Sequence, residues 1–161
     1  MASEPGQKRG PFVDTYLSYL LAHASQVVAG EFHEALKEWN ISVAEWRVLS
    51  SLYGRDRVGV TELAAMAILK LPRVTAIVDR LVAAELIERL SASRDRRRVY
   101  VRLTESGKFT VRPIVRAAKA HEERILANLS APERQTIMRA LDIIMRSTQS
   151  KNEDTSSSEA A

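Results

Sequence analysis

Residues 89–107 constrain the fold of this chain more than any other segment. Residues 89–102 hold six arginines and one aspartate. Apolar residues then recur at every second position, at Val99, Val101 and Leu103, which predicts a strand with one buried face. Because an unpaired buried charge costs several kcal/mol or more, we expect a β-hairpin whose arginine-rich tip faces solvent or a polyanion. Taken alone, the run suits a solvated loop as well as a nucleic-acid contact.

The positive charge of the chain is local. The whole chain has a net charge of +4, whereas residues 89–102 alone carry +5, a clustering that is typical of nucleic-acid-binding surfaces. The 161 residues, 45% of them hydrophobic, suffice for one domain with a real core. The absence of cysteine excludes disulfides, thiolate metal sites and thiol redox sensing. No apolar run approaches the roughly 18 residues of a membrane span, so we expect a cytoplasmic protein without membrane association.

Helical periodicity accounts for most of the sequence. Apolar residues spaced three and four apart predict six helices, over about 11–39, 42–53, 61–68, 72–84, 104–129 and 132–148. The first is interrupted only by Gly30, and Pro113 should bend or break the fifth. The predicted N-terminal signals are the capping boxes Ser42/Glu45 and Ser130/Glu133, the caps Thr61 and Thr104, and Pro72 at a first helical position. The apolar stripe of the first helix is wider than a small domain can bury, so we expect part of it to meet a second subunit.

The order of these elements predicts a mainly α fold with a small two- to three-stranded β-wing. Two helices joined by a tight turn and followed at once by a basic hairpin form a winged helix-turn-helix. We expect a flexible tail over 1–10, a single domain over 11–148, and a disordered tail over 149–161. Within the domain, the winged helix-turn-helix covers about 42–103, and the helical dimerisation region covers about 11–39 and 104–148.

This arrangement suggests how the chain would contact DNA. The first turn of the helix over 72–84 would enter a major groove, where Arg73 and Thr75 reach base edges or nearby phosphates. Thr61 and the free N–H groups of its helix would hold a phosphate. The wing arginines would lie along the adjacent backbone or enter the minor groove. The predicted DNA-binding residues are Thr61, Lys70, Pro72, Arg73, Thr75, Ala76, Arg80, Arg94, Asp95, Arg96, Arg97 and Arg98.

Over about residues 11–148 the chain resembles the MarR family of winged-helix transcriptional regulators. The resemblance rests on VDRL at 78–81, LIER at 86–89, Asp95-Arg96-Arg97, and LTESG at 103–107. It implies an obligate homodimer formed by the first, fifth and sixth helices, and a wing stiffened by Asp95 pairing with Arg97. The chain departs from the family at two places. Pro72-Arg73 replaces a frequent Ser or Thr pair, and Glu85 replaces a frequent glycine.

The same resemblance implies a small-molecule effector, since many family members bind one between the first, second and fifth helices. Candidates to line such a site are Tyr16, Tyr19, His23, Trp39, Trp46 and Arg47. Aromatic residues at helical spacing are more often part of a core. A histidine, aromatic rings and a cation would nevertheless suit a small aromatic acid or its thioester.

No catalytic or metal-binding pattern emerges. The segment from Gly54 to Thr61 imitates a phosphate-binding loop, but Val60 stands in the lysine position and a helix precedes it. We therefore expect no enzyme, no cofactor and no metal site. The sequence predicts a homodimeric DNA-binding regulator, a repressor that binds a pseudo-palindromic operator and is released by a small effector. The alternative is a helical protein-interaction module whose arginine-rich loop binds an acidic partner.

Overall fold

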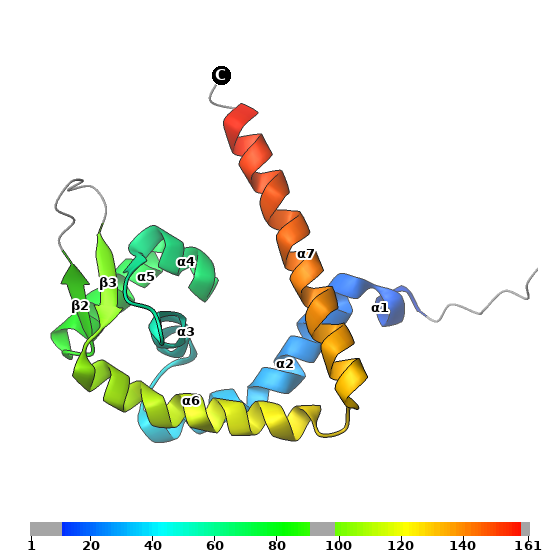
Figure 1. Ribbon diagram of the computed structural model, residues 1–161, viewed down its shortest axis with the longest axis horizontal. Helices are drawn as coiled ribbons and strands as arrows, with labels where there is room; N and C mark the ends of the chain where they lie inside the picture. The colour runs from blue at the N-terminus through cyan, green and yellow to red at the C-terminus, as the bar shows by residue number, and fades with distance from the viewer. Residues whose placement is uncertain (1–10, 91–98, 159–161) are drawn as a thin grey trace, which may run out of the picture. The chain divides into compact units, whose positions relative to one another are not determined.

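A computed structural model of the protein describes residues 11–90 and 99–158, with side chains up to Ser147. The elements are α1 (Phe12–Thr15), α2 (Leu17–Ala35), the 3₁₀ helix η1 (Leu36–Trp39), α3 (Val43–Leu52), β1 (Val58–Gly59), α4 (Val60–Ala67), α5 (Leu71–Ala83), β2 (Ile87–Leu90), β3 (Tyr100–Leu103), α6 (Glu105–Leu126) and α7 (Ala131–Ser158). The predicted fold class, mainly α with a small β-wing, is confirmed (Figure 1). The chain divides into two compact units, residues 1–121 and 122–161, whereas the sequence predicts one domain over 11–148.

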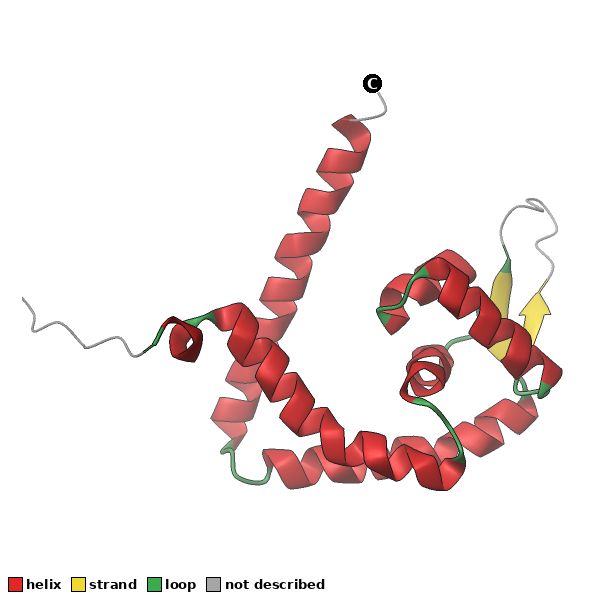
Figure 2. Ribbon diagram, turned by 180° about the vertical axis from the view of Figure 1, so that it is seen from behind, coloured by secondary structure: helices red, strands yellow, loops and turns green. Residues whose placement is uncertain are grey.

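The main core of the first unit lies around α3. Helix α3 runs between the α4–α5 pair on one side and α6 on the other (Figures 1 and 2). Its side chains Val48, Leu49 and Leu52 are fully buried and pack with the inner faces of α4, α5 and the sheet. A second, smaller cluster of Phe32, Leu36 and Ile114 joins α2 and η1 to α6.

The sheet has three antiparallel strands in the order β1-β3-β2. Ile87 pairs with Leu103, and Val58 pairs with Val101, and all four side chains are buried. Val99 was expected to be buried with Val101 and Leu103, and this is wrong, because Val99 is 44% exposed. It precedes β3 and lines the cavity beside α4 and α5 instead of the core, and its carbonyl accepts from the N–H of Val60 at 3.0 Å.

Of the four predicted helix caps, two are confirmed in full, one in part, and one is wrong. At the start of α7 the N–H of Ser130 donates to Glu133 Oε2 at 2.8 Å, which is one half of the predicted box. The N–H of Glu45 donates to Ser42 Oγ at 3.2 Å, and the N–H of Ser42 donates to Glu45 Oε2 at 2.9 Å, which completes the capping box. The N–H of Gly107 donates to Thr104 Oγ1 at 2.9 Å. Thr61, however, caps nothing, because β1 leads directly into α4 and the helix begins one residue earlier, at Val60.

The breaks and ends of three helices differ from the sequence prediction. The predicted break at Gly30 is absent, since α2 runs through it, and a short break falls at Tyr16 instead. A glycine inside a helix costs only about 1 kcal/mol, which is too little to end a well-packed helix. Helix α6 is also continuous through Pro113. The segment 149–158, predicted to be disordered, is helical in α7, and no glycine or proline follows Pro132 to end that helix.

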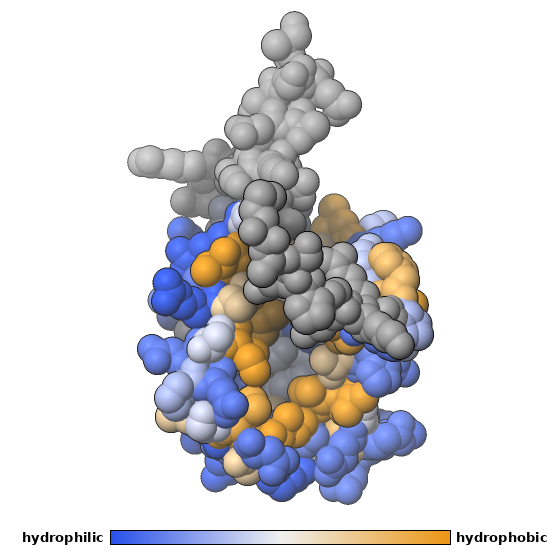
Figure 3. All heavy atoms as spheres, turned by 90° about the vertical axis from the view of Figure 1, so that its right-hand side faces the viewer, coloured by the Kyte–Doolittle hydropathy of each residue, from blue (hydrophilic) through white to orange (hydrophobic). Residues whose placement is uncertain are grey.

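Many apolar side chains remain uncovered in the single chain, and Figure 3 shows part of this surface in orange. In the first unit they include Phe12, Leu17, Leu20, Val27 and Val28, and in the second unit Ile137, Met138, Ile143 and Met145. Over residues 11–90 and 99–158, no helix combines the length and the apolar character that crossing a bilayer requires.

Candidate nucleic-acid interface

Helix α5 has one buried face and one polar face. The buried face consists of Val74, Ile77, Val78 and Leu81, which recur at three- and four-residue steps. The opposite face carries the predicted DNA-binding residues Pro72, Arg73, Thr75, Ala76 and Arg80, all of them exposed. The burial of the first set therefore fixes the presentation of the second set to solvent.

A tight turn sets the angle between α4 and α5. Ile68 adopts the left-handed conformation, with φ +55°. The N–H of Leu69 donates to the carbonyl of Ala64 at 3.0 Å, and the N–H of Ile68 donates to that of Ala65 at 3.1 Å. These bonds satisfy the last carbonyls of α4 and reverse the chain within three residues. The geometry is that of a helix-turn-helix.

The start of α5 is the most positive part of this motif. Lys70 is the N-cap residue, and Arg73 lies in the first turn. Both side chains are exposed, and neither forms an ion pair within the described residues. The free N–H groups and the helix dipole add positive potential at this end. An anionic backbone would therefore be attracted to this turn.

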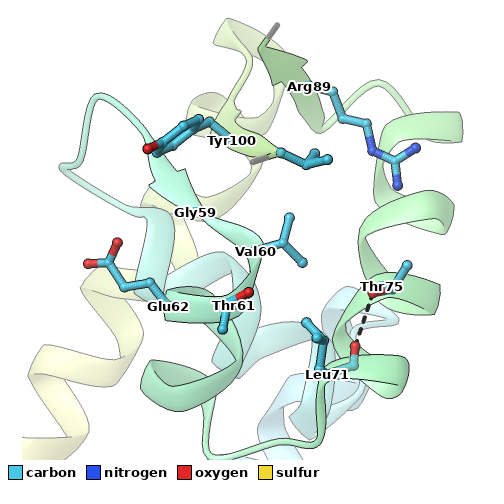
Figure 4. Close-up of a pocket in the computed structure, with 9 residues that line it drawn as sticks. Gly59, Val60, Thr61, Glu62, Leu71, Thr75, Arg89 and Tyr100 are labelled. Carbon is cyan, nitrogen blue, oxygen red and sulfur yellow. Dashed lines mark hydrogen bonds between the residues drawn. The ribbon is translucent and has the colours of Figure 1, made fainter. Parts of the chain in front are cut away.

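A cavity of about 480 Å³ separates the α4–α5 motif from the base of the hairpin. Thr61 and Glu62 line it from α4, Thr75 from α5, and Arg89 and Tyr100 from the strands (Figure 4). The hydroxyl of Thr75 donates to the carbonyl of Leu71 at 3.0 Å, which leaves its oxygen free to accept. The structure thus brings Thr61 and Thr75 to one concave surface.

Two arginines near this surface are held by carboxylates. Arg80 Nε lies 3.2 Å from Glu45 Oε1, and Arg89 pairs with Asp79. Burial raises the pKa of Glu45, but the hydrogen bonds from Ser42 and the charge of Arg80 outweigh it, so the pKa is lower than usual. Arg80 is therefore tied to α3, and Arg73 is freer to reach DNA.

One further cation, Arg57, lies next to a residue that lines the cavity and was not predicted from the sequence. The guanidinium carbon of Arg57 lies 5.1 Å from the centre of the Tyr100 ring, within the range of a cation–π contact. Arg57 belongs to the loop before β1, which the sequence identifies only as a connection. The pairing of β1 with β3 brings Arg57 close to the basic hairpin. This contact joins residues far apart in the sequence, so local sequence patterns do not predict it.

The comparison with known proteins agrees with this geometry. The profile of the MarR family matches residues 41–99. FarR of Neisseria gonorrhoeae, an HTH-type transcriptional regulator, is 34% identical over 87 residues, which span 54% of this chain and 60% of FarR. The solved MarR family transcriptional regulator SPO1453 from Silicibacter pomeroyi DSS-3 is 34% identical, with a TM-score of 0.75 over 84% of this chain and 99% of that chain. This chain belongs to the MarR family.

A further solved relative is NadR in complex with 4-hydroxyphenylacetate. It is 25% identical, with a TM-score of 0.73, and the match covers 89% of this chain and 96% of that chain.

The region that the MarR profile matches runs from just before α3 to just before β3. In this MarR protein the shared region therefore covers the helix-turn-helix and the first strand of the hairpin, and the protein is a transcriptional regulator of that family.

The tip of the MarR wing lies outside the described residues. Arg94, Asp95, Arg96, Arg97 and Arg98 fall in the segment 91–98, so the predicted pairing of Asp95 with Arg97 stays a prediction. At the described base of the hairpin, Arg102 Nε donates to Glu88 Oε1 at 2.8 Å across β2 and β3.

The residues predicted to bind an effector fall into two groups. Tyr16, at the break between α1 and α2, stacks on Phe12, and Tyr19 stacks on His23 in the exposed first half of α2. The second group, Trp39, Trp46 and Arg47, is half-buried, and the two tryptophans pack against the second core cluster.

The separation of the two groups follows from the length of α2. Trp46 meets Phe32 edge to face at 5.4 Å. Tyr19 lies thirteen residues before Phe32, or about 20 Å along the helix axis at 1.5 Å per residue. One subunit therefore does not gather all six residues around one small ligand. Near the second group, burial and the charge of Arg47 lower the pKa of His33.

Proposed function

We propose that this MarR-family protein is a homodimeric repressor that binds a pseudo-palindromic DNA site. The observation that carries the proposal is the start of α5 beside the cavity at the base of the hairpin, where Lys70 and Arg73 form no ion pair with any residue that the structure describes. Helix α5 would enter the major groove, and the hairpin would follow the neighbouring backbone. Thr61 would donate a hydrogen bond to a phosphate oxygen, and Thr75, whose hydroxyl already donates to Leu71, would accept one from a base edge.

Exposed apolar surface supports the homodimer. Contiguous apolar residues on α2, such as Leu17, Leu20 and Val27, are unusual on a monomer's surface, and an obligate dimer would cover them. Two identical reading helices related by a two-fold axis would read two half-sites about one helical turn, roughly 34 Å, apart. The pseudo-palindromic site follows from that symmetry.

An effector would act on this dimer. NadR, a solved relative, is in complex with 4-hydroxyphenylacetate, and we extend the chemistry of a small aromatic acid to this chain. Trp39 and Trp46 offer rings against the second core cluster, and the half-buried Arg47 adds a cation next to Trp46 on α3. Tyr16, Tyr19 and His23 would join such a site only through a second subunit or form a separate one. Binding there would release the protein from DNA.

Selection from random-sequence duplexes tests the DNA-binding proposal. The full chain should enrich an inverted repeat with half-sites about one helical turn apart. Bound at a promoter that overlaps this repeat, the protein should lower transcript yield in vitro.

Absence of any enriched sequence would favour the alternative, in which the arginine-rich loop binds an acidic protein. Enrichment of a site with raised transcript yield would contradict repression. A role on genomic DNA would place the protein in the cytoplasm.

A further inference from the structure

A second cavity, of about 320 Å³, lies away from the DNA-facing cavity and shares no lining residue with it. It is formed where the end of α3, the loop before β1, the end of β3 and the first turns of α6 meet. Tyr53, Arg55, Asp56, Lys108 and Arg112 line it. Leu52 and Leu103 also border it, and both are almost fully buried. We call it the α3–α6 cavity.

The backbone on both sides of the α3–α6 cavity is fixed. On the loop side, the N–H of Arg55 donates to the carbonyl of Leu52 at 3.1 Å, next to Gly54 with φ +78°. On the helix side, Gly107 lies so close to the carbonyl of Leu86 that a Cβ would come within 2.0 Å of its oxygen. The cations at both edges therefore stand on backbone that is already held in place before a ligand arrives.

Positive charge dominates the α3–α6 cavity. Arg55, Lys108 and Arg112 face one lining carboxylate, Asp56. Lys108 donates to Glu105 at 2.7 Å, whereas Arg55 and Arg112 form no ion pair with any described residue. A concave surface lined mainly by one sign of charge focuses its potential and concentrates counter-ions. Such a surface favours an anion.

The positive charges around the α3–α6 cavity also lower the pKa of a nearby carboxylate, Glu105. The hydrogen bond from Lys108 and its charge lower the pKa of Glu105, and the charges of Arg102 and Arg112 lower it further. The charge of Arg112 therefore reaches Glu105 in the first turn of α6 as well as the cavity that Arg112 lines.

We propose that the α3–α6 cavity binds a small organic phosphate. A phosphoryl group carries close to two negative charges at pH 7 and three acceptor oxygens, which suits a cavity lined by Arg55 and Arg112, with Lys108 beside them in a pair with Glu105. Arginine presents several N–H donors in a fixed plane that suits phosphate oxygens. The exposed Tyr53 supplies apolar surface for the carbon skeleton. The volume is at the lower end of small-molecule sites.

Phenyl phosphate is a suitable probe, and benzoate is its control with the same ring and a single charge. Each is titrated into the ¹⁵N-labelled full chain at pH 7.5 and constant ionic strength, and amide shifts are followed by NMR. We expect saturable shifts at Gly54, Arg55 and Lys108 with phenyl phosphate, and at least fivefold weaker binding of benzoate.

The matched variants are Arg112→Ala and Arg116→Ala. Both residues are exposed on α6 one turn apart, and only Arg112 lines the cavity. Arg112→Ala should weaken phenyl phosphate binding at least fivefold, and Arg116→Ala less than twofold. Equal losses in both variants, or unsaturable shifts spread over Lys70 and Arg73 as well, would overturn the proposal. So would duplex DNA shifting the cavity amides as strongly as phenyl phosphate, because the cavity would then belong to the DNA surface.

Discussion

At the scale of single residues, two turns of the motif hold side chains in a conformation that they resist. Ile68 between α4 and α5, and Glu85 between α5 and β2, have φ values of +55° and +58°. Left-handed backbone is unfavourable for residues with a Cβ, and most of all for β-branched ones. Both turns are closed by backbone bonds, such as that from the N–H of Leu86 to the carbonyl of Leu81 at 2.9 Å. Packing of the flanking elements therefore outweighs the local preference.

Replacing Ile68 with Asn should raise the free energy of unfolding by about 1 kcal/mol, since asparagine tolerates left-handed backbone. Little burial is lost, because Ile68 is 79% exposed. Urea denaturation at fixed protein concentration measures the change. Ile68→Val, which keeps the β-branch, should stay within about 0.5 kcal/mol of the parent. A less stable Asn variant would show that the side chain of Ile68 makes contacts that the single chain does not reveal.

Gly107 is required by space. In Gly107→Ala, the added Cβ would meet the Leu86 oxygen at 2.0 Å, so the start of α6 must shift. We expect a loss of about 3 kcal/mol in thermal or urea unfolding. Gly30→Ala is the matched control, because no atom lies within 4 Å of its Cβ. It should stabilise α2 by about 0.5–1 kcal/mol. Similar effects of the two substitutions would contradict the close approach at Gly107.

At the scale of elements, the start of α3 joins a helix cap to the recognition helix. Glu45 bonds to Ser42 and pairs with Arg80 of α5. Glu45→Ala should therefore cost about 1 kcal/mol at pH 7. The pKa of Glu45 is lower in the folded protein than its value of 4.5 in the unfolded chain. The stabilisation is therefore fully present above pH 4.5 and is lost as the pH falls through the pKa of Glu45 in the folded protein.

The difference in stability between the parent and Glu45→Ala should accordingly narrow below about pH 4.5. Urea midpoints from pH 3 to pH 7 would measure it. Glu122→Ala, at an exposed position of α6, should change stability by less than about 0.5 kcal/mol at every pH. A constant difference between parent and Glu45→Ala across this range would show that the charge of Glu45 contributes nothing.

Elements with strong local signals could be predicted from the sequence. The capping box of Ser42 and Glu45 identified the start of α3, and the three- and four-residue spacing from Val74 to Leu81 identified the buried face of α5. Thr61 was misassigned as a cap because β1 is only two residues long and carries no strand pattern. Its pairing with β3 joins residues that are far apart in the sequence, and local periodicity does not report such contacts.

At the scale of the whole molecule, the exposed apolar face of α2 predicts self-association. Leu17→Glu, at a position 55% exposed in the single chain, would place a charge in the dimer interface and should convert the dimer to monomer. Sedimentation velocity at micromolar concentration measures this. Ser18→Glu, the adjacent exposed position, is the control for added charge. A parent protein that sediments as a monomer would refute the dimer outright.

The candidate interface was predictable in part. The exposed positions of α5 follow from its period, so Arg73 and Thr75 could be assigned to the polar face. Which arginines are available to contact DNA could not be predicted from the sequence. Arg80 is paired with Glu45 and Arg89 with Asp79, and each pair joins different segments of the chain. Arg57 was missed for the same reason. Tertiary contacts decide which cations remain free to meet a phosphate.

The most direct test of the central claim is the specificity ratio of Arg73→Ala. Fluorescence anisotropy at fixed salt would compare affinity for the selected operator with affinity for a scrambled duplex. A good contact between arginine and a base is worth about 1–3 kcal/mol, so Arg73→Ala should lower the ratio about tenfold. Lys119→Ala, an exposed cation on α6, should leave it within twofold. If Arg73→Ala keeps both the affinity and the ratio of the parent, α5 is not the element that reads DNA.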